Sequence, residues 1–152
     1  MDTATKRTVI RIRLDKAHED LAASRDNLER GYLRTAVNRA YFTVFHAASA
    51  ALLWLDIERA RHSGIESAFG QYFVKAGLIE PEYGRFYSRA RDWREDQDYS
   101  DSARVLTPST VRQIVADAGR FVARVEQYLL EVGAASESGA RISLNTDGDN
   151  VD

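Results

Sequence analysis

The sequence predicts an all-α fold class, and three features of the chain support it. Long stretches contain neither glycine nor proline, apolar residues recur within them at helical spacing, and glycine or a Thr-Pro pair stands at their ends. Residues 9–14 alternate like a strand, but the alternation does not continue. We expect an antiparallel bundle of four long helices plus one short helix, with a disordered acidic C-terminal tail.

The first two helices follow from their apolar spacing. After a frayed start, the first helix should begin near Thr8 and end at Gly31, and its apolar residues are Ile10, Leu14, Ala17, Leu21 and Leu28. The second helix should cover residues 32–55, which contain no glycine or proline. Its main apolar stripe consists of Val37, Tyr41, Val44, Ala48, Ala51 and Leu55.

The short helix and the fourth helix are predicted from their end signals. Ser63 and Glu66 have the spacing of a capping box, in which each side chain bonds the backbone N–H of the other residue. Gly77 should end the short helix. Pro81 suits the first turn of the fourth helix.

The fifth helix should start after Thr107, a capping residue followed by Pro108, and should end at Gly133. Beyond that glycine the helical period is lost, and serine, glycine, asparagine and aspartate accumulate. We therefore divide the chain into a helical domain, residues 8–133, and a disordered acidic tail, residues 134–152.

The composition is that of one globular domain. Of 152 residues, 44% are hydrophobic and 29% are charged, and the formal net charge is -2. There is no cysteine and no apolar run near the ~20 residues of a membrane span, so we expect a cytoplasmic protein without membrane contact. The three histidines lack metal-ligand spacing and no glycine-rich phosphate loop is present, so we expect no metal and no cofactor. Any contact with nucleic acid must use a local patch.

The strongest candidates for a site are Arg39 and His46 in the second helix. They are seven positions apart, which makes them nearly eclipsed and separates them by roughly 10 Å along the axis. Their face lies away from the main apolar stripe, yet it also carries Phe42, Thr43, Ala50 and Leu53. Because a helix that is apolar on both sides is usually buried on both sides, we expect a homodimer that joins through this helix.

An imidazole and a guanidinium suit metal-free cleavage of RNA. Histidine titrates near neutrality and can take the proton of a ribose 2′-hydroxyl. The planar fork of arginine matches phosphate oxygens and stabilises the charge that develops on phosphorus. Two such pairs meeting across a two-fold axis would supply a base, an acid and two cations. The competing interpretation is structural: a half-buried histidine and a surface arginine.

Other residues could bind RNA near this pair. Arg61, Arg89 and Arg94 could follow a phosphate backbone toward it. Tyr99 could stack on a base. The competing interpretation of these arginines is a solvated surface with local ion pairs.

Residues 36–48, which read Ala-Val-Asn-Arg-Ala-Tyr-Phe-Thr-Val-Phe-His-Ala-Ala, resemble the signature helix of the HEPN domain (higher eukaryotes and prokaryotes nucleotide-binding). Two further blocks support the resemblance, His62-Ser63-Gly64 with residues 69–75, and residues 94–99. The resemblance covers roughly residues 14–132 and is to the small stand-alone prokaryotic branch of that superfamily.

The resemblance implies a helical bundle that dimerises through the signature helices and, in active members, cleaves RNA without a metal. Arg39 and His46 match the family motif Arg-x(4–6)-His. Asn38 occupies a position that is often polar. The resemblance also implies a minimal nucleotidyltransferase as the partner in a toxin–antitoxin pair. In some of these pairs the nucleotidyltransferase modifies a tyrosine two residues after the histidine. This chain has Ala48 at that position, so the resemblance does not carry over this form of regulation.

We therefore expect a HEPN-type metal-independent endoribonuclease that leaves a 2′,3′-cyclic phosphate and is the toxin of a toxin–antitoxin pair, with a nucleotidyltransferase-type antitoxin. Arg39 and His46 from two protomers would form a composite site, supported by Asn38, Thr43 and Tyr99. The alternative is a non-catalytic HEPN module that binds nucleotides or RNA, or an accessory subunit of a minimal nucleotidyltransferase.

Overall fold

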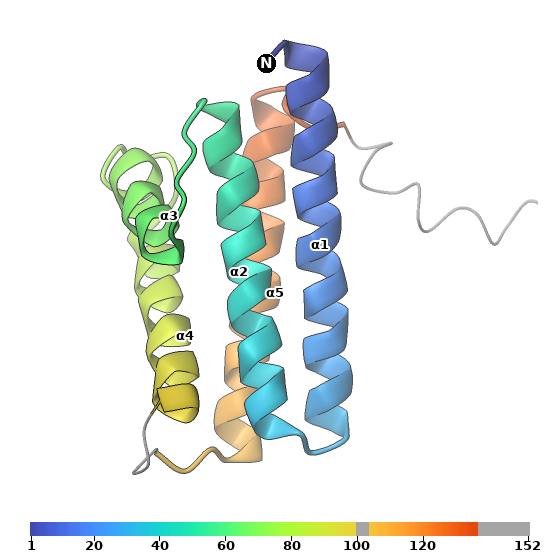
Figure 1. The fold of residues 1–152 in the computed structure, drawn as a ribbon, viewed down its shortest axis with the longest axis vertical. Helices are drawn as coiled ribbons and strands as arrows, with labels where there is room; N and C mark the ends of the chain where they lie inside the picture. Colours follow the sequence, from blue (N-terminus) through green and yellow to red (C-terminus); the bar gives the residue numbers. More distant parts are fainter. Residues whose placement is uncertain (100–103, 137–152) are drawn as a thin grey trace, which may run out of the picture.

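The computed structural model describes residues 1–99 and 104–136 and contains five α-helices there (Figure 1). They are α1 (Thr3–Glu29), α2 (Leu33–Trp54), α3 (His62–Phe69), α4 (Pro81–Tyr99) and α5 (Pro108–Glu131), and a π-helical segment, η1 (Gly70–Val74), continues α3. Four helices are long, with 27, 22, 19 and 24 residues. The predicted all-α bundle of four long helices and one short helix is confirmed. Most of the predicted acidic tail, residues 137–152, lies outside the described residues.

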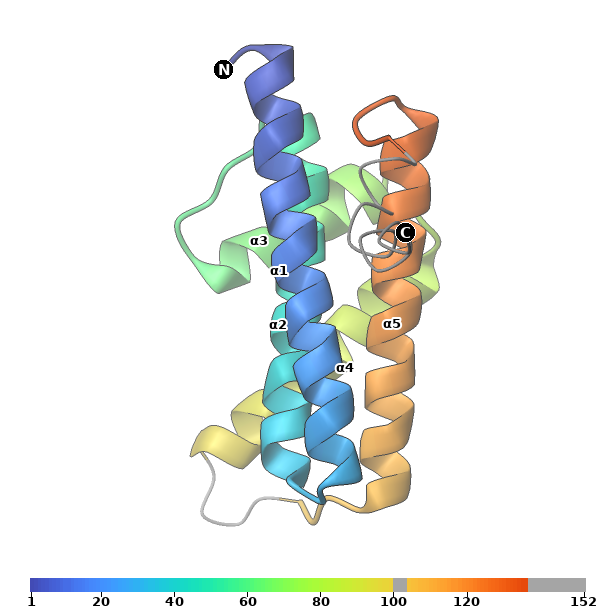
Figure 2. The same cartoon turned by 90° about the vertical axis from the view of Figure 1, so that its right-hand side faces the viewer.

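The second helix is the centre of the bundle. In Figure 1, α1 runs downward, α2 upward, α4 downward and α5 upward, with α3 in the crossover between α2 and α4. Figure 2 shows α4 tilted across the other long helices. Each of the other four helices contacts α2. A residue on α2 can therefore meet side chains from any part of the fold.

The predicted ends of the helices are confirmed where the signal is local. Gly31, Gly77 and Gly133 have φ values of 79°, 76° and 76°, a left-handed conformation that glycine adopts without a steric penalty. Thr107 caps α5, because its hydroxyl oxygen accepts the N–H of Thr110 at 3.1 Å. These interactions join neighbouring residues and need no tertiary partner.

The start of the first helix differs from the prediction. α1 begins at Thr3 rather than near Thr8. Asp2 caps it and accepts a backbone N–H of the first turn at 2.7 Å. Lys6, expected to be frayed, forms an ion pair of 2.8 Å with Asp56. The added turn is stabilised by this cap and by a tertiary contact with the loop after α2.

The predicted capping box at Ser63 and Glu66 is wrong. α3 begins at His62 with Arg61 as its N-cap, and no side chain bonds the first turn. The carboxylate of Glu66 instead lies 3.5 Å from the guanidinium of Arg91 on α4. A half-buried carboxylate is stabilised more by a charged donor than by a backbone N–H that water can satisfy.

The packed region also extends beyond the predicted domain end at residue 133. Ala134 is 1% exposed, and its N–H donates to the carbonyl of Leu129 at 2.8 Å. In the part of the chain that the structure describes, no helix is long and apolar enough to cross a membrane.

The apolar character of the Arg39 face has a different cause from the one predicted. Thr43, Ala50 and Leu53 are 0%, 0% and 3% exposed within a single protomer, because other helices of the same chain pack around α2. Their burial therefore does not require a second copy. Between its two ends, the residues of this helix that stay half-buried and reach the surface are Asn38, Arg39, Phe42, Phe45, His46 and Ser49. The homodimer remains a prediction.

Candidate functional site

One edge of α1 carries a polar residue at every seventh position: Lys6, Arg13, Asp20 and Asn27. Seven residues are close to two helical turns, so these side chains share one side of the helix. All four are half-buried. Arg13, for example, crosses to α2 and donates to the carbonyl and the hydroxyl of Ser49 at 3.1 and 3.0 Å. This polar edge brings an acidic residue, Asp20, to the middle of α2.

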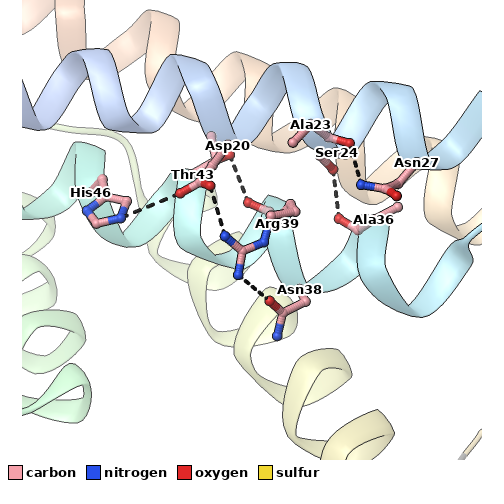
Figure 3. A network of polar contacts seen from close by, with 9 residues as sticks. All are labelled: Asp20, Ala23, Ser24, Asn27, Ala36, Asn38, Arg39, Thr43 and His46. Carbon is pink, nitrogen blue, oxygen red and sulfur yellow. Dashed lines mark hydrogen bonds and ion pairs between the residues drawn. The ribbon is translucent and has the colours of Figure 1, made fainter.

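Asp20 joins the two residues that the sequence predicts to be catalytic (Figure 3). Its Oδ1 accepts a hydrogen bond from Nη1 of Arg39 at 3.1 Å, and its Oδ2 lies 3.5 Å from Nε2 of His46. Nη2 of Arg39 donates to Oδ1 of Asn38 at 2.7 Å. The side chains of Asp20, Arg39 and His46 are 15%, 36% and 24% exposed. The three are held in place and are still open to solvent.

The surroundings of His46 favour its neutral form. Burial is the largest influence and lowers the pKa of the imidazole below its ordinary value. Asp20 opposes this effect and raises the pKa, whereas Lys16, Arg39 and Arg13 lower it further. An imidazole that is neutral at neutral pH can accept a proton, which is the property required of a general base.

The ring of Phe42 gathers four titratable or cationic side chains around it. The guanidinium carbons of Arg39 and Arg94 lie 5.0 and 5.1 Å from its centre, within the range of a cation–π interaction. The imidazole rings of His46 and His62 lie 6.3 and 5.7 Å from the same centre. One protomer therefore holds two guanidiniums and two imidazoles beside a half-exposed aromatic ring. Such a cluster suits a phosphodiester and an adjacent base.

The three arginines that the sequence nominates for RNA binding are not gathered in one place. Arg94 belongs to the Phe42 cluster, and its Nε lies 3.7 Å from Asp98 one turn later. Arg89 is about 140° around α4 from Arg94 and lies over the ring of Phe86, in a groove between α4 and α5. Arg61 is the exposed N-cap of α3, next to His62 in the chain.

The predicted supporting residues differ in what they can reach. Asn38 accepts a hydrogen bond from Arg39 and is half-buried at the surface. Thr43 is fully buried, and its hydroxyl donates to the carbonyl of Arg39 at 2.9 Å. It can steady the helix but cannot contact a ligand. Tyr99 is the last residue of α4, and its side chain lies outside the described part of the structure.

Three residues that the structure brings to the site were not predicted as site residues: Asp20, Phe42 and His62. The signal for Asp20 was the heptad of polar residues on the first helix, which a search for apolar stripes passes over. The signal at His62 was the His62-Ser63-Gly64 block of the family resemblance, but its place beside α2 could not be read from the sequence because a loop separates the two helices. Within residues 1–99 and 104–136, no group of three or more histidine or acidic side chains is arranged to hold a metal ion.

The fold and the cluster define a class: a small all-α bundle with an Arg-x6-His pair on its central helix. The family model of the HEPN domain matches residues 10–128. The chain belongs to the HEPN domain family, as the resemblance of its second helix predicted.

Relatives agree with the small prokaryotic branch of this family. "Putative toxin MJ0605" of Methanocaldococcus jannaschii is 34% identical over 126 residues, covering 83% of this chain and 92% of that protein. A "UPF0332 protein" of Thermotoga maritima is 31% identical over 120 residues, 79% of this chain and 90% of its own length. "Putative toxin MJ0142" of Methanocaldococcus jannaschii is 25% identical over 117 residues, 77% of this chain and 79% of that protein.

Proposed function

We propose that this protein is a metal-independent endoribonuclease of the HEPN type and the toxin of a toxin–antitoxin pair. The observation that carries the proposal is the half-exposed pair of Arg39 and His46, joined by Asp20 and placed beside Phe42. The assignment as a toxin is supported by the names of two relatives. Its expected location is the cytoplasm, and its expected antitoxin is a nucleotidyltransferase.

In the proposed reaction, His46 is the general base. Its Nδ1, the ring nitrogen that does not face Asp20, takes the proton of a ribose 2′-hydroxyl, the 2′-oxygen attacks phosphorus, the bond to the 5′-oxygen breaks, and an acid protonates the leaving 5′-oxygen. The products are a 2′,3′-cyclic phosphate and a 5′-hydroxyl. Arg39 binds the phosphate oxygens as charge develops on them. The carboxylate of Asp20 stabilises the imidazolium and orients both side chains.

The proposal includes a composite site built from two protomers that join through α2. Phe42 and Phe45 support this assembly, because both rings are half-exposed on the surface of α2 beside the pair. Apolar side chains at a surface gain free energy when a partner covers them. Light scattering at micromolar concentration should report a dimer. A stable monomer would contradict the composite site.

The catalytic proposal is tested with single-stranded RNA in the presence of a chelator. Wild-type protein should cleave it and leave 2′,3′-cyclic phosphate ends, and His46→Ala and Arg39→Ala should both lose the activity. His18→Gln is the matched control, since this imidazole on α1 is paired with Glu126 on α5, away from the site. Cleavage that the chelator abolishes would refute the proposed chemistry.

One observation favours the alternative of a module that binds RNA or nucleotides without cleaving them. The carboxylate of Asp20 already accepts a hydrogen bond from the guanidinium of Arg39, and a carboxylate competes with phosphate for the same N–H donors. This alternative predicts that the wild-type protein binds RNA or co-purifies with a nucleotidyltransferase, yet shows no cleavage in the same assay.

A further inference from the structure

The first residue of α3, His62, lies against the aromatic residues that also border His46. The centre of its imidazole is 4.4 Å from the ring of Phe45 and 5.7 Å from that of Phe42. The imidazole of His46 is 5.2 and 6.3 Å from the same two rings. Both imidazole centres thus lie within 5.2 Å of the centre of the Phe45 ring, and this limits the distance between them. His62 is exposed and His46 is half-buried, so both can reach a molecule that lies on the two phenyl rings.

Contacts on both sides hold His62 in this position. One turn further along α3, the carboxylate of Glu66 is 3.5 Å from the guanidinium of Arg91 and accepts a long hydrogen bond of 3.4 Å from Ser88, so α3 contacts α4 at this turn. On the other side the preceding loop packs closely, since a Cβ added at Gly64 would lie 3.2 Å from the Cβ of Arg59. These contacts place the backbone at the start of α3, and the imidazole of His62 itself lies against the two phenyl rings.

We propose that His62 is the general acid of the site and protonates the leaving 5′-oxygen while His46 removes the proton of the 2′-hydroxyl. This inference rests on the proposed cleavage chemistry and replaces one part of the composite site, because the acid is His62 of the same protomer and not a histidine of the partner. A bond forms between the 2′-oxygen and phosphorus, and the bond between phosphorus and the 5′-oxygen breaks. One proton passes to His46 and another leaves the imidazolium of His62, so the charges balance. Exchange with water then restores both residues.

The acid is required because an alkoxide is a poor leaving group. In the composite arrangement that role falls to the second protomer's copy of the catalytic histidine. The positions of His62 and His46 beside Phe45 supply a base and an acid within one protomer instead. A dimer is then not needed for the second proton transfer.

The test compares two dinucleotide substrates, one with the natural 5′-oxygen and one with a bridging 5′-sulfur, whose thiolate leaves without a proton. His62→Gln should slow cleavage of the oxygen substrate about 100-fold or more and should cleave the sulfur substrate at nearly the wild-type rate. His46→Gln should be slow with both, because each substrate needs its 2′-hydroxyl deprotonated. His18→Gln should behave as wild type with both.

Equal slowing of the two substrates by His62→Gln, or no slowing with oxygen, would overturn the inference and leave the proposed function standing. Wild-type protein that cleaves neither substrate would overturn both. If His62→Gln does not fold, the wild-type pH profile still tests whether the site uses an acid. The value of kcat/KM should fall at alkaline pH with the oxygen substrate and should not fall with the sulfur substrate. A fall with both substrates would count against general-acid catalysis. If both variants fold, mixing them tests which protomer supplies the acid. Mixing His46→Gln with His62→Gln should restore nothing, since restoration would mean that the acid comes from the other protomer.

Discussion

Replacing Asp20 by asparagine keeps the size of the side chain and removes its charge. The carboxylate makes one hydrogen bond of 3.1 Å to Arg39 and one ion-pair contact of 3.5 Å to His46. An amide oxygen can still accept from Arg39, but it no longer stabilises an imidazolium. Because Arg39 is 36% exposed, the loss of folding stability should be about 1 kcal/mol. The effect on catalysis depends on the contact with His46.

The size of the catalytic effect follows from the contact to His46, because only this partner of Asp20 changes its charge during the reaction. A contact to a charged group contributes about 1 kcal/mol more than a contact to a neutral one. Asp20→Asn therefore removes about 1 kcal/mol of transition-state stabilisation. At about 1.4 kcal/mol for each factor of ten, kcat/KM should fall about 5-fold.

The pH profile of kcat/KM tests the physical cause. Its acid limb reports the pKa of the base in the free enzyme, and Asp20 raises the pKa of His46. Asp20→Asn should therefore move the acid limb to lower pH. Lys16→Gln is the matched opposite, since Lys16 lowers the same pKa, and it should move the limb to higher pH. A rise of kcat/KM in Asp20→Asn would refute this role and indicate that the carboxylate blocks Arg39.

Two further predictions concern stability, measured by urea unfolding. Glu126 hydrogen bonds to His18 and raises the pKa of that imidazole. This contribution is complete below the ordinary histidine pKa and is lost as pH rises through the raised value, so His18→Gln should destabilise more at about pH 5 than at about pH 9. A gap that widens with pH would contradict the pairing. Ser24 is fully buried and donates to the carbonyl of Ala36 at 2.7 Å, so Ser24→Ala should cost about 1 kcal/mol at every pH. A neutral result would mean that this bond does not hold α1 to α2.

The helices and their ends are readable from the chain because the interactions that set them are local. A capping threonine bonds a residue three positions on, and Gly31 ends α1 through its own φ angle. The failure at Glu66 has a tertiary cause, because its partner, Arg91, is on another helix. The first turn of α1 was missed although its cap, Asp2, bonds a residue three positions on, and the ion pair between Lys6 and the loop after α2 that supports this turn depends on the tertiary fold.

The spacing along one helix is also enough to place Arg39 and His46 on the same face, since that depends only on the period of the α-helix. What surrounds them depends on the register between helices. Asp20 meets the pair because α1 packs antiparallel to α2 at one particular offset, and the loop before α3 brings His62 to Phe45. Packing of whole helix faces sets that register, and no short stretch of sequence records it.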